Sequence, residues 1–237
     1  MPAKDFENRL LLALPGRELE FLAPHLEKTA TPYKEVLADE DSSLDYVYFP
    51  NSGVISVVAV YSDGNTSEMA TIGREGTTGF QELLGGRASS ARLLVQVKGS
   101  AMRLKRSSFN RAVKELPTFR TLMYAHLHAF LLQVMLSGAC NSAHTVKQRL
   151  ARWLLMMQDR HNEGPLLVTQ ELLAEMLGVH RPTVSTAARS LSKDGVIQIK
   201  RGCVQIVDRH RLVGSSCECY EIIRTRTAQW LPKTYPA

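Results

Sequence analysis

A run of basic and hydroxyl side chains in the C-terminal third of the chain has the chemistry to contact a nucleic acid. Its members are Arg181, Thr183, Ser185, Thr186 and Arg189, and no acidic residue follows them before Asp194. Guanidinium groups bind phosphates and guanine edges, and hydroxyl groups hydrogen-bond to phosphates and bases. The run therefore predicts a DNA-binding surface, to which we also assign the neighbouring Thr169, Gln170 and His180.

The residues around this run have the spacing of a helix-turn-helix. In a count that starts at residue 170, Ala174, Gly178 and Val184 stand at positions five, nine and fifteen. A small residue at the first position lets two helices cross, and a glycine at the second permits a left-handed turn. An aliphatic residue at the third fills the space between the helices. Thr169 is expected to cap the first helix.

A predicted β-hairpin, or wing, follows the two helices. Residues 195–207 alternate between apolar and polar on both sides of Gly202, and Lys200 and Arg201 at the tip are expected to bind phosphate. Residues 144–237 carry 14 basic and 8 acidic residues, whereas residues 1–143 carry 15 of each. The whole net charge of +6 therefore lies in the part that carries the predicted DNA-binding elements.

The segment from residue 121 to residue 146 contains no acidic or basic residue and is predicted to form a long helix. Apolar residues recur there at alternating spacings of three and four, as in the seam of a helical dimer. The seam residues are Leu122, Ala125, Ala129, Leu132, Leu136 and Ala139. A second stripe, Met123, Phe130 and Val134, is expected to cover the neighbouring domain. A membrane span has a similar length, but polar residues interrupt the run. We therefore predict a dimerisation helix, with a helix buried inside one domain as the alternative.

Residues 36–104 predict an antiparallel β-domain. Short alternating runs at 44–49, 54–61, 68–72 and 93–97 are separated by turn residues at 50–53, 62–65 and 73–76. Strands of about five to eight residues at this spacing are typical of a sandwich or barrel. Helices are expected on either side, at residues 7–14 and from Ser107 to near Leu116.

Composition defines the class of protein. With 237 residues, 44% of them hydrophobic and 22% charged, the chain is an ordinary globular protein of the α+β class. We divide it into residues 1–117, 118–143 and 144–237.

The first residues have no apolar core of signal-peptide length, so a cytoplasmic location is expected. No phosphate-binding glycine loop, nucleophile motif or metal-ligand spacing occurs, so we predict no enzyme activity and no cofactor.

In the order of these parts and in the helix-turn-helix motif, the chain resembles the catabolite activator and fumarate-nitrate-reductase regulator (CRP/FNR) family over about residues 36–207. The resemblance implies a cyclic-nucleotide-binding-like β-roll (jelly roll), a long dimerisation helix and a winged helix-turn-helix. It also implies a homodimer that places two second helices in successive major grooves of a palindromic operator, with RNA polymerase as a partner. Arg181 and Ser185 match family reading positions. Pro182 and Thr186 replace the usual glutamate and arginine, so no operator sequence can be transferred.

The cyclic-nucleotide cassette of that family is degenerate in this chain. The family pattern has a Gly-Glu pair for the ribose and an Arg-Ser or Arg-Thr pair for the phosphate. The matching places here read Gly76-Thr-Thr-Gly79 and Ser89-Ser-Ala-Arg92. A buried phosphate without a positioned cation lacks its charge-assisted hydrogen bonds, so cyclic AMP is not the expected effector. The alternative is an effector pocket in a shifted register, formed by Glu75, Thr77, Thr78, Glu82, Arg87 and Arg92.

The cysteines and histidines do not match the other sensors of the family. An oxygen-sensing iron–sulfur cluster would need several N-terminal cysteines, and none precedes Cys140. Cys217 and Cys219 lie two apart in one predicted C-terminal helix, so they should diverge, and neither a disulfide nor a metal chelate is favoured. His126 and His128 diverge in the same way and are expected to be core or interface residues. We predict no metal site, and a redox-responsive role for the cysteines stays open as an alternative.

Overall fold

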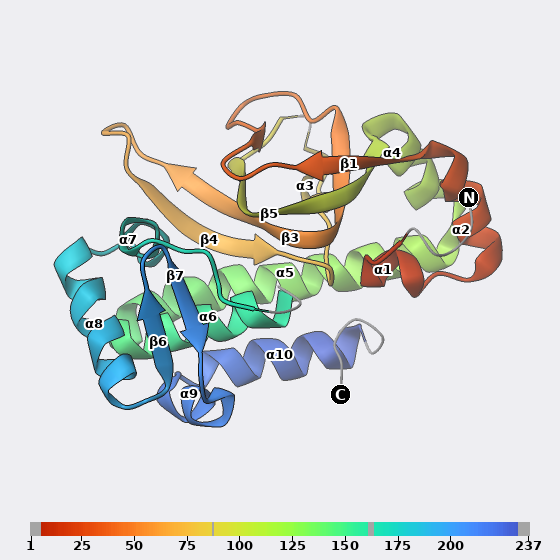
Figure 1. Ribbon diagram of the computed structural model, residues 1–237. Coiled ribbons are helices and arrows are strands. Elements are labelled where there is room, and N and C mark those ends of the chain that lie inside the picture. The colour runs from red at the N-terminus through yellow and green to blue at the C-terminus, as the bar shows by residue number, and fades with distance from the viewer. Residues whose placement is uncertain (1–5, 87, 161–163, 232–237) are drawn as a thin grey trace.

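The computed structural model describes residues 6–86, 88–160 and 164–231 and is arranged around one long helix, α5 (Pro117–Ala143). A β-sheet domain lies on one side of this helix, and the C-terminal helices α6 (Val146–Arg160) and α10 (Cys219–Trp230) lie along the other (Figure 1). The predicted α+β class is confirmed, as is the order of sheet domain, long helix and winged helix-turn-helix. Arg87, one of the predicted effector residues, lies outside the described residues.

The N-terminal domain is built on an antiparallel sheet. Its strands are β1 (Leu26–Thr31), β2 (Val36–Ala38), β3 (Tyr46–Val60), β4 (Thr66–Ile72) and β5 (Arg92–Lys105), in the order β1-β5-β3-β4, with β2 also paired to β5. The short helix α3 (Phe80–Leu83) follows β4. Its Phe80 stacks on Phe130 of α5 with ring centroids 4.2 Å apart. The core of the sheet domain therefore extends onto the long helix, as predicted for the Phe130 stripe.

One predicted turn is instead a bulge inside a continuous strand. The sequence predicted a turn at residues 50–53, but β3 runs through this segment, and its pairing with β5 shifts register there. Gly53 has a φ of +78°, and a Cβ at this position would collide with the carbonyl oxygen of Val97. A Cβ on Gly99, in the facing strand, would collide with the backbone of β3. The two glycines let the strands approach closely at the bulge, so the prediction of a turn was wrong.

Short helices close one end of the sheet. They are α1 (Arg9–Leu12), α2 (Gly16–Leu22), the 3-10 helix η2 (Ala23–His25) and α4 (Arg106–Glu115). The side chain of Asn8 caps α1 by accepting bonds from the amides of Leu10 and Leu11. It also donates to the carbonyl oxygen of Gly76 at 2.9 Å, which ties α1 to the loop after β4. Both leucines are fully buried together with Phe109 of α4.

Helix α5 is buried on one face and exposed on another. By length and composition alone it could cross a membrane, but it packs against β4, α3 and a C-terminal helix along its length. The exposed residues recur at spacings of three and four and form what we call the exposed seam. They are Thr121, Tyr124, His128, Leu131, Met135, Gly138 and Ser142. Met135, at 64% exposure, is the most exposed large apolar side chain of this seam.

The predicted dimer seam is offset from the exposed seam by about one residue, or about 100° around the helix axis. Ala129 is buried, and Leu122 and Ala125 pack partly against the N-terminal core. Leu136 packs against the C-terminal core, Leu132 is half-buried and Ala139 is exposed. The periodicity of the seam is present, but much of the predicted face is covered by the chain itself.

The C-terminal domain begins directly after α5. Its elements are α6 (Val146–Arg160), α7 (Gln170–Leu177), α8 (Arg181–Lys193), β6 (Ile197–Lys200), β7 (Cys203–Ile206), α9 (Arg209–Ser215) and α10 (Cys219–Trp230). Trp153, Val184 and Tyr220 belong to one buried cluster that also takes in Val54 and Val58 of β3. The C-terminal domain therefore packs on the β3–β4 hairpin, and α10 returns along α5 (Figure 1).

Candidate nucleic-acid interface

The two helices α7 and α8 form the predicted helix-turn-helix. Thr169 caps α7 by accepting a bond from the amide of Leu172 at 3.2 Å. Gly178 ends the helix in the left-handed region with φ 60° and ψ 43°, and the amide of Val179 then bonds the carbonyl oxygen of Ala174 at 3.0 Å. Val184 is completely buried between the helices. All three positions that define the motif in the sequence therefore have the conformation or packing that their residue type suggested.

The predicted DNA-contacting residues gather on one surface of the C-terminal domain. Those that are exposed are Thr169, His180, Arg181, Thr183, Thr186, Arg189, Lys200 and Arg201, and those that are half-buried are Gln170 and Ser185. On α8 the buried residues are Val184, Ala187, Ala188 and Leu191, so the polar run occupies the opposite face. The helix has no acidic residue on that face, and its first turn contains none.

Local contacts hold these side chains in place. Arg181 forms an exposed ion pair with Glu171 of α7, with Nε and Oε1 3.0 Å apart. The hydroxyl of Ser185 donates to Oε1 of Gln170 at 2.5 Å. The guanidinium of Arg189 donates to the carbonyl oxygen of Ser185 at 3.2 Å. An exposed ion pair contributes little free energy, so Arg181 can exchange Glu171 for a phosphate or a base at small cost.

The hairpin β6–β7 places its two cations beside the start of α8. Gly202 turns the hairpin with φ +74°, and Lys200 and Arg201 on its tip are exposed. A groove of about 580 Å³ lies between the hairpin and the two helices, and Gln170, Arg181, Lys200 and Arg201 are among the residues that line it. The polar groups of the helices and the cations of the wing therefore face one shared space.

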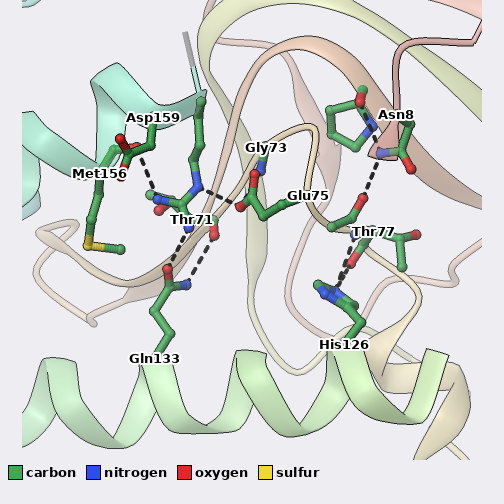
Figure 2. Close-up of polar contacts among 12 residues, drawn as sticks. Asn8, Thr71, Gly73, Glu75, Thr77, His126, Gln133, Met156 and Asp159 are labelled. Carbon is green, nitrogen blue, oxygen red and sulfur yellow. Dashed lines mark hydrogen bonds and ion pairs between the residues drawn. The ribbon is translucent and has the colours of Figure 1, made fainter. Parts of the chain in front are cut away.

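A buried polar network joins the sheet domain to α5 and α6. Nε of Arg160, at the end of α6, donates to Glu75 Oε1 at 2.6 Å, and the same guanidinium donates to Oε1 of Gln133 at 2.9 Å. The amide of Gln133 donates to the carbonyl oxygen of Thr71 at 3.0 Å. Figure 2 shows Gln133 of α5 pointing up at Thr71, with Glu75 beside them. Arg160 and Gln133 were not predicted from the sequence, because their partners lie 85 and 62 residues away and no local pattern marks them.

Burial and charge act in opposite directions in this network. Burial by itself would raise the pKa of Glu75, but the Arg160 guanidinium and backbone amides outweigh burial and lower the pKa of that carboxyl. Burial also lowers the pKa of His126, whose Nε2 lies 3.0 Å from the carbonyl oxygen of Thr77. His126 is therefore a neutral core histidine at neutral pH, in agreement with its predicted role.

The five predicted effector residues that the structure describes do not converge on one cavity. Glu75 pairs with Arg160. The hydroxyl of Thr77 donates to the carbonyl oxygen of Tyr48 in β3, and the hydroxyl of Thr78 accepts from the amide of Tyr48. Of the remaining residues, Glu82 accepts from Arg106 and Asn110, and Arg92 pairs with Asp39 at 2.9 Å. The cavity beside Glu75 and His126 has about 20 Å³, which suffices for about one water molecule.

A second polar contact between the domains involves Glu68 of β4. The indole of Trp153 donates to Oε1 at 2.8 Å, and the hydroxyl of Ser56 donates to Oε2 at 2.6 Å. Burial raises the pKa of Glu68 to about 7, although these two donors and nearby arginines oppose the shift. The folded protein therefore keeps a proton on Glu68 at pH values where the unfolded chain has lost it.

We expect this shift to make stability depend on pH. A raised acid pKa stabilises the folded state fully below the unfolded value of 4.5, and the stabilisation is lost as pH rises through about 7. The shift is equivalent to about 3 kcal/mol, which partial exposure of the side chain reduces to about 1–2 kcal/mol. Relative to wild type, Glu68→Gln should therefore become more stable by about this amount as the pH rises from 5 to 8, as measured by urea unfolding. Glu115→Gln, on an exposed helix face, is the control, and an equal gain there would contradict the assignment.

Several solved structures share this fold at low sequence identity. FixK2 from Bradyrhizobium japonicum is 22% identical with a TM-score of 0.69, and 81% of this chain and 98% of that one are covered. The c-di-GMP responsive global regulator CLP from Xanthomonas campestris is 16% identical with a TM-score of 0.66 over 81% and 99%. A CRP/FNR-family regulator from Thermus thermophilus is 21% identical with a TM-score of 0.66 over 82% and 98%. At these identities the similarity establishes the fold alone.

Family models match both domains. A model described as a cyclic nucleotide-binding domain matches residues 31–115, and one described as a Crp-like helix-turn-helix domain matches residues 148–214. No curated protein matches the chain in sequence. The two matched regions follow one another in the chain and are joined by α5. With these two domains in this order, the chain belongs to the CRP/FNR family of transcription regulators.

Proposed function

We propose that the protein is a homodimeric, sequence-specific DNA-binding regulator that inserts α8 of each subunit into the major groove. The observation that carries the proposal is the face of α8 that bears Arg181, Thr183, Thr186 and Arg189 without an acidic residue. An α-helix fits the major groove, where guanidinium and hydroxyl groups can contact base edges. Lys200 and Arg201 of the wing would add phosphate contacts that are independent of sequence.

The exposed seam of α5 is the surface that we assign to dimerisation. A coiled coil needs apolar or small residues at alternating spacings of three and four, and Tyr124, Leu131, Met135 and Gly138 supply them. Leu132 and Ala139 of the predicted seam lie at its edge. Two copies related by a twofold axis would present their α8 helices to two half-sites, so the operator is expected to be palindromic. A cytoplasmic location and contact with RNA polymerase are part of the same proposal.

We do not assign cyclic AMP as the effector. The charged residues of the predicted pocket that the structure describes each pair with a residue outside it, as Glu75 does with Arg160 and Arg92 with Asp39. A nucleotide phosphate would have to displace Asp39 from Arg92 to gain a cation. A regulator that responds to a cyclic nucleotide in a rearranged pocket, or to redox state, is the alternative.

Replacing Arg181 with alanine should weaken binding to the specific operator about 10- to 100-fold, because one base-reading guanidinium is lost. Arg181 is exposed, and among the described residues it forms an ion pair with the exposed Glu171, so the fold should be retained. Operator fragments would be selected from random DNA with the wild-type protein, and binding would be measured by fluorescence anisotropy on the selected site and on a scrambled one.

The control is Arg226→Ala, which removes the same charge from an exposed position on α10. Both variants should bind scrambled DNA with nearly the same affinity. If Arg181→Ala bound the selected site as tightly as Arg226→Ala, the assignment of α8 as the reading helix would be incorrect.

A further inference from the structure

Three cysteines and a histidine meet where the C-terminal end of α5 lies against the connection between α9 and α10. Cys140 belongs to the last turns of α5 and His144 follows directly after it, while Cys217 and Cys219 flank the start of α10. The three cysteines are buried, and the side chain of His144 is 15% exposed. The four ligand atoms, three Sγ and one imidazole nitrogen, all lie within 4.8 Å of one another.

The break between α9 and α10 brings the two C-terminal cysteines together. The sequence analysis placed both in one helix, where residues two apart diverge. Instead α9 ends at Ser215 and α10 begins at Cys219, so Cys217 lies in the connection. Its Sγ is 3.4 Å from Sγ of Cys140, and Sγ of Cys219 is 3.7 Å from Nδ1 of His144. The reason for excluding a chelate therefore does not hold.

These distances are those of a tetrahedral site for one metal ion. Zinc binds thiolates at about 2.3 Å and imidazole at about 2.0–2.1 Å, which places neighbouring ligand atoms of a tetrahedron about 3.5–3.8 Å apart. The observed 3.4 Å and 3.7 Å are close to this edge length, and the other pairs of ligand atoms lie within 4.8 Å of one another. An iron–sulfur cluster holds several iron and sulfide ions between its thiolates, so its ligands must lie further apart.

The surroundings of His144 favour metal binding by Nδ1. Nε2 of the ring lies 3.2 Å from Oε1 of Glu218, the residue between the two cysteines. A carboxylate that accepts the proton of one ring nitrogen fixes the tautomer and leaves the lone pair of the other nitrogen for a metal. Here that other nitrogen, Nδ1, is the one that faces Cys219. His144 thus has a carboxylate hydrogen-bonded to its other ring nitrogen, as metal-bound histidines usually have.

The charge around the cluster also suits a bound cation with thiolate ligands. Three thiolates and one divalent ion carry a net charge of −1. The side chain of Arg152 lies close enough to act on all three cysteines electrostatically, and it is buried. Its Nε is buried without a hydrogen-bond partner among the described residues. The positive charge of a buried guanidinium is compensated by the net negative charge of a thiolate-bound metal ion. Neutral thiols would leave that charge uncompensated.

We propose that Cys140, His144, Cys217 and Cys219 bind one Zn²⁺ ion in a closed tetrahedral site. The ion would fasten the connection between α9 and α10 to the end of α5, and thereby fix the helix-turn-helix domain relative to the seam helix. A disulfide between Cys140 and Cys217 is the competing use of these thiols, and it would leave Cys219 and His144 without a role.

The metal content of the full-length protein tests the proposal. Protein purified under reducing conditions from zinc-supplemented cells should contain one zinc per chain by plasma mass spectrometry. After removal of zinc by a chelator at low pH and refolding, Co²⁺ should produce the strong visible absorption of a tetrahedral thiolate complex, and Zn²⁺ should abolish it. Cys217→Ser and His144→Ala should lower the zinc content and weaken or remove this absorption.

Cys203→Ser is the matched control, because Cys203 lies in the wing and is remote from the cluster in the fold. It should retain one zinc per chain. If the wild-type protein carried less than about a tenth of an equivalent of zinc and gave no cobalt absorption, the proposal would be overturned. Equal metal content in Cys203→Ser and Cys217→Ser, or a Cys140–Cys217 disulfide by mass spectrometry in freshly purified protein, would overturn it as well. Because the cobalt titration uses wild-type protein, the result does not depend on the variants folding.

Discussion

Replacing Glu75 with leucine should destabilise the protein by about 3–5 kcal/mol, because the guanidinium of Arg160 would stay buried without its carboxylate. The two side chains are 8% and 4% exposed, and their charged atoms are 2.6 Å apart. The measurement is urea unfolding followed by circular dichroism and by tryptophan fluorescence, to which Trp153 and Trp230 both contribute. The pair connects the loop after β4 with the end of α6, so the two probes should still report a single transition.

Two comparisons separate the ion pair from a general effect of the substitution. The double variant Glu75→Leu, Arg160→Met should recover much of the lost stability, since an apolar pair of similar volume can replace a buried ion pair. Glu27→Leu, which breaks the half-exposed pair of Glu27 and Arg103, should cost less than about 1 kcal/mol. Equal losses of unfolding free energy for Glu27→Leu and Glu75→Leu would show that the buried pair stabilises the protein no more than the exposed one.

Leu131→Glu should convert the dimer into monomers and reduce operator affinity by about 100-fold or more, because the two half-sites would no longer be bound as one unit. In the proposed dimer the substitution places two carboxylates opposite one another in an apolar seam, where they are desolvated without a counter-charge. Leu131 is exposed in the single chain, so the monomer itself should remain folded. Sedimentation equilibrium gives the oligomeric state, and anisotropy with a palindromic operator gives the affinity.

Leu84→Glu makes the same substitution at a position that is 64% exposed and lies outside α5 and α10, and it should leave the dimer intact. Ala129→Glu distinguishes the two candidate faces of α5. Since Ala129 is buried within the chain, that change should impair folding rather than dimerisation alone. A folded Leu131→Glu protein that sediments as a dimer would exclude the exposed seam as the interface.

The parts of the fold that are set by local sequence could be predicted. The turn at Gly178 requires a left-handed conformation, and the small and aliphatic residues at Ala174 and Val184 act over one or two helical turns. The same holds for the wing, whose alternation and glycine lie within a few residues. The prediction of a helix-turn-helix with a basic hairpin needed no knowledge of the rest of the chain.

The parts of the fold that depend on residues distant in the sequence could not be predicted. The bulge at Gly53 forms because another glycine faces it from β5, far along the chain. The seam that we propose differs by one residue from the predicted one, because periodicity gives the spacing of a stripe but not which stripe the chain covers with its own core. The meeting of Cys140 with Cys217 required the break between two helices, which a continuous helical pattern concealed.

The stacking of Trp230 on His128, with ring centroids 3.8 Å apart, gives the end of α10 a place beside the exposed seam. One seam residue is thus held by a side chain that comes about a hundred positions later, so the surface that pairs two copies would be composite. Shortening the protein after the wing would remove more than a peripheral helix. It would remove Trp230 from the proposed contact between subunits. The part of α5 around His128 that Trp230 covers would then be exposed to water, and exposed apolar surface favours non-specific self-association.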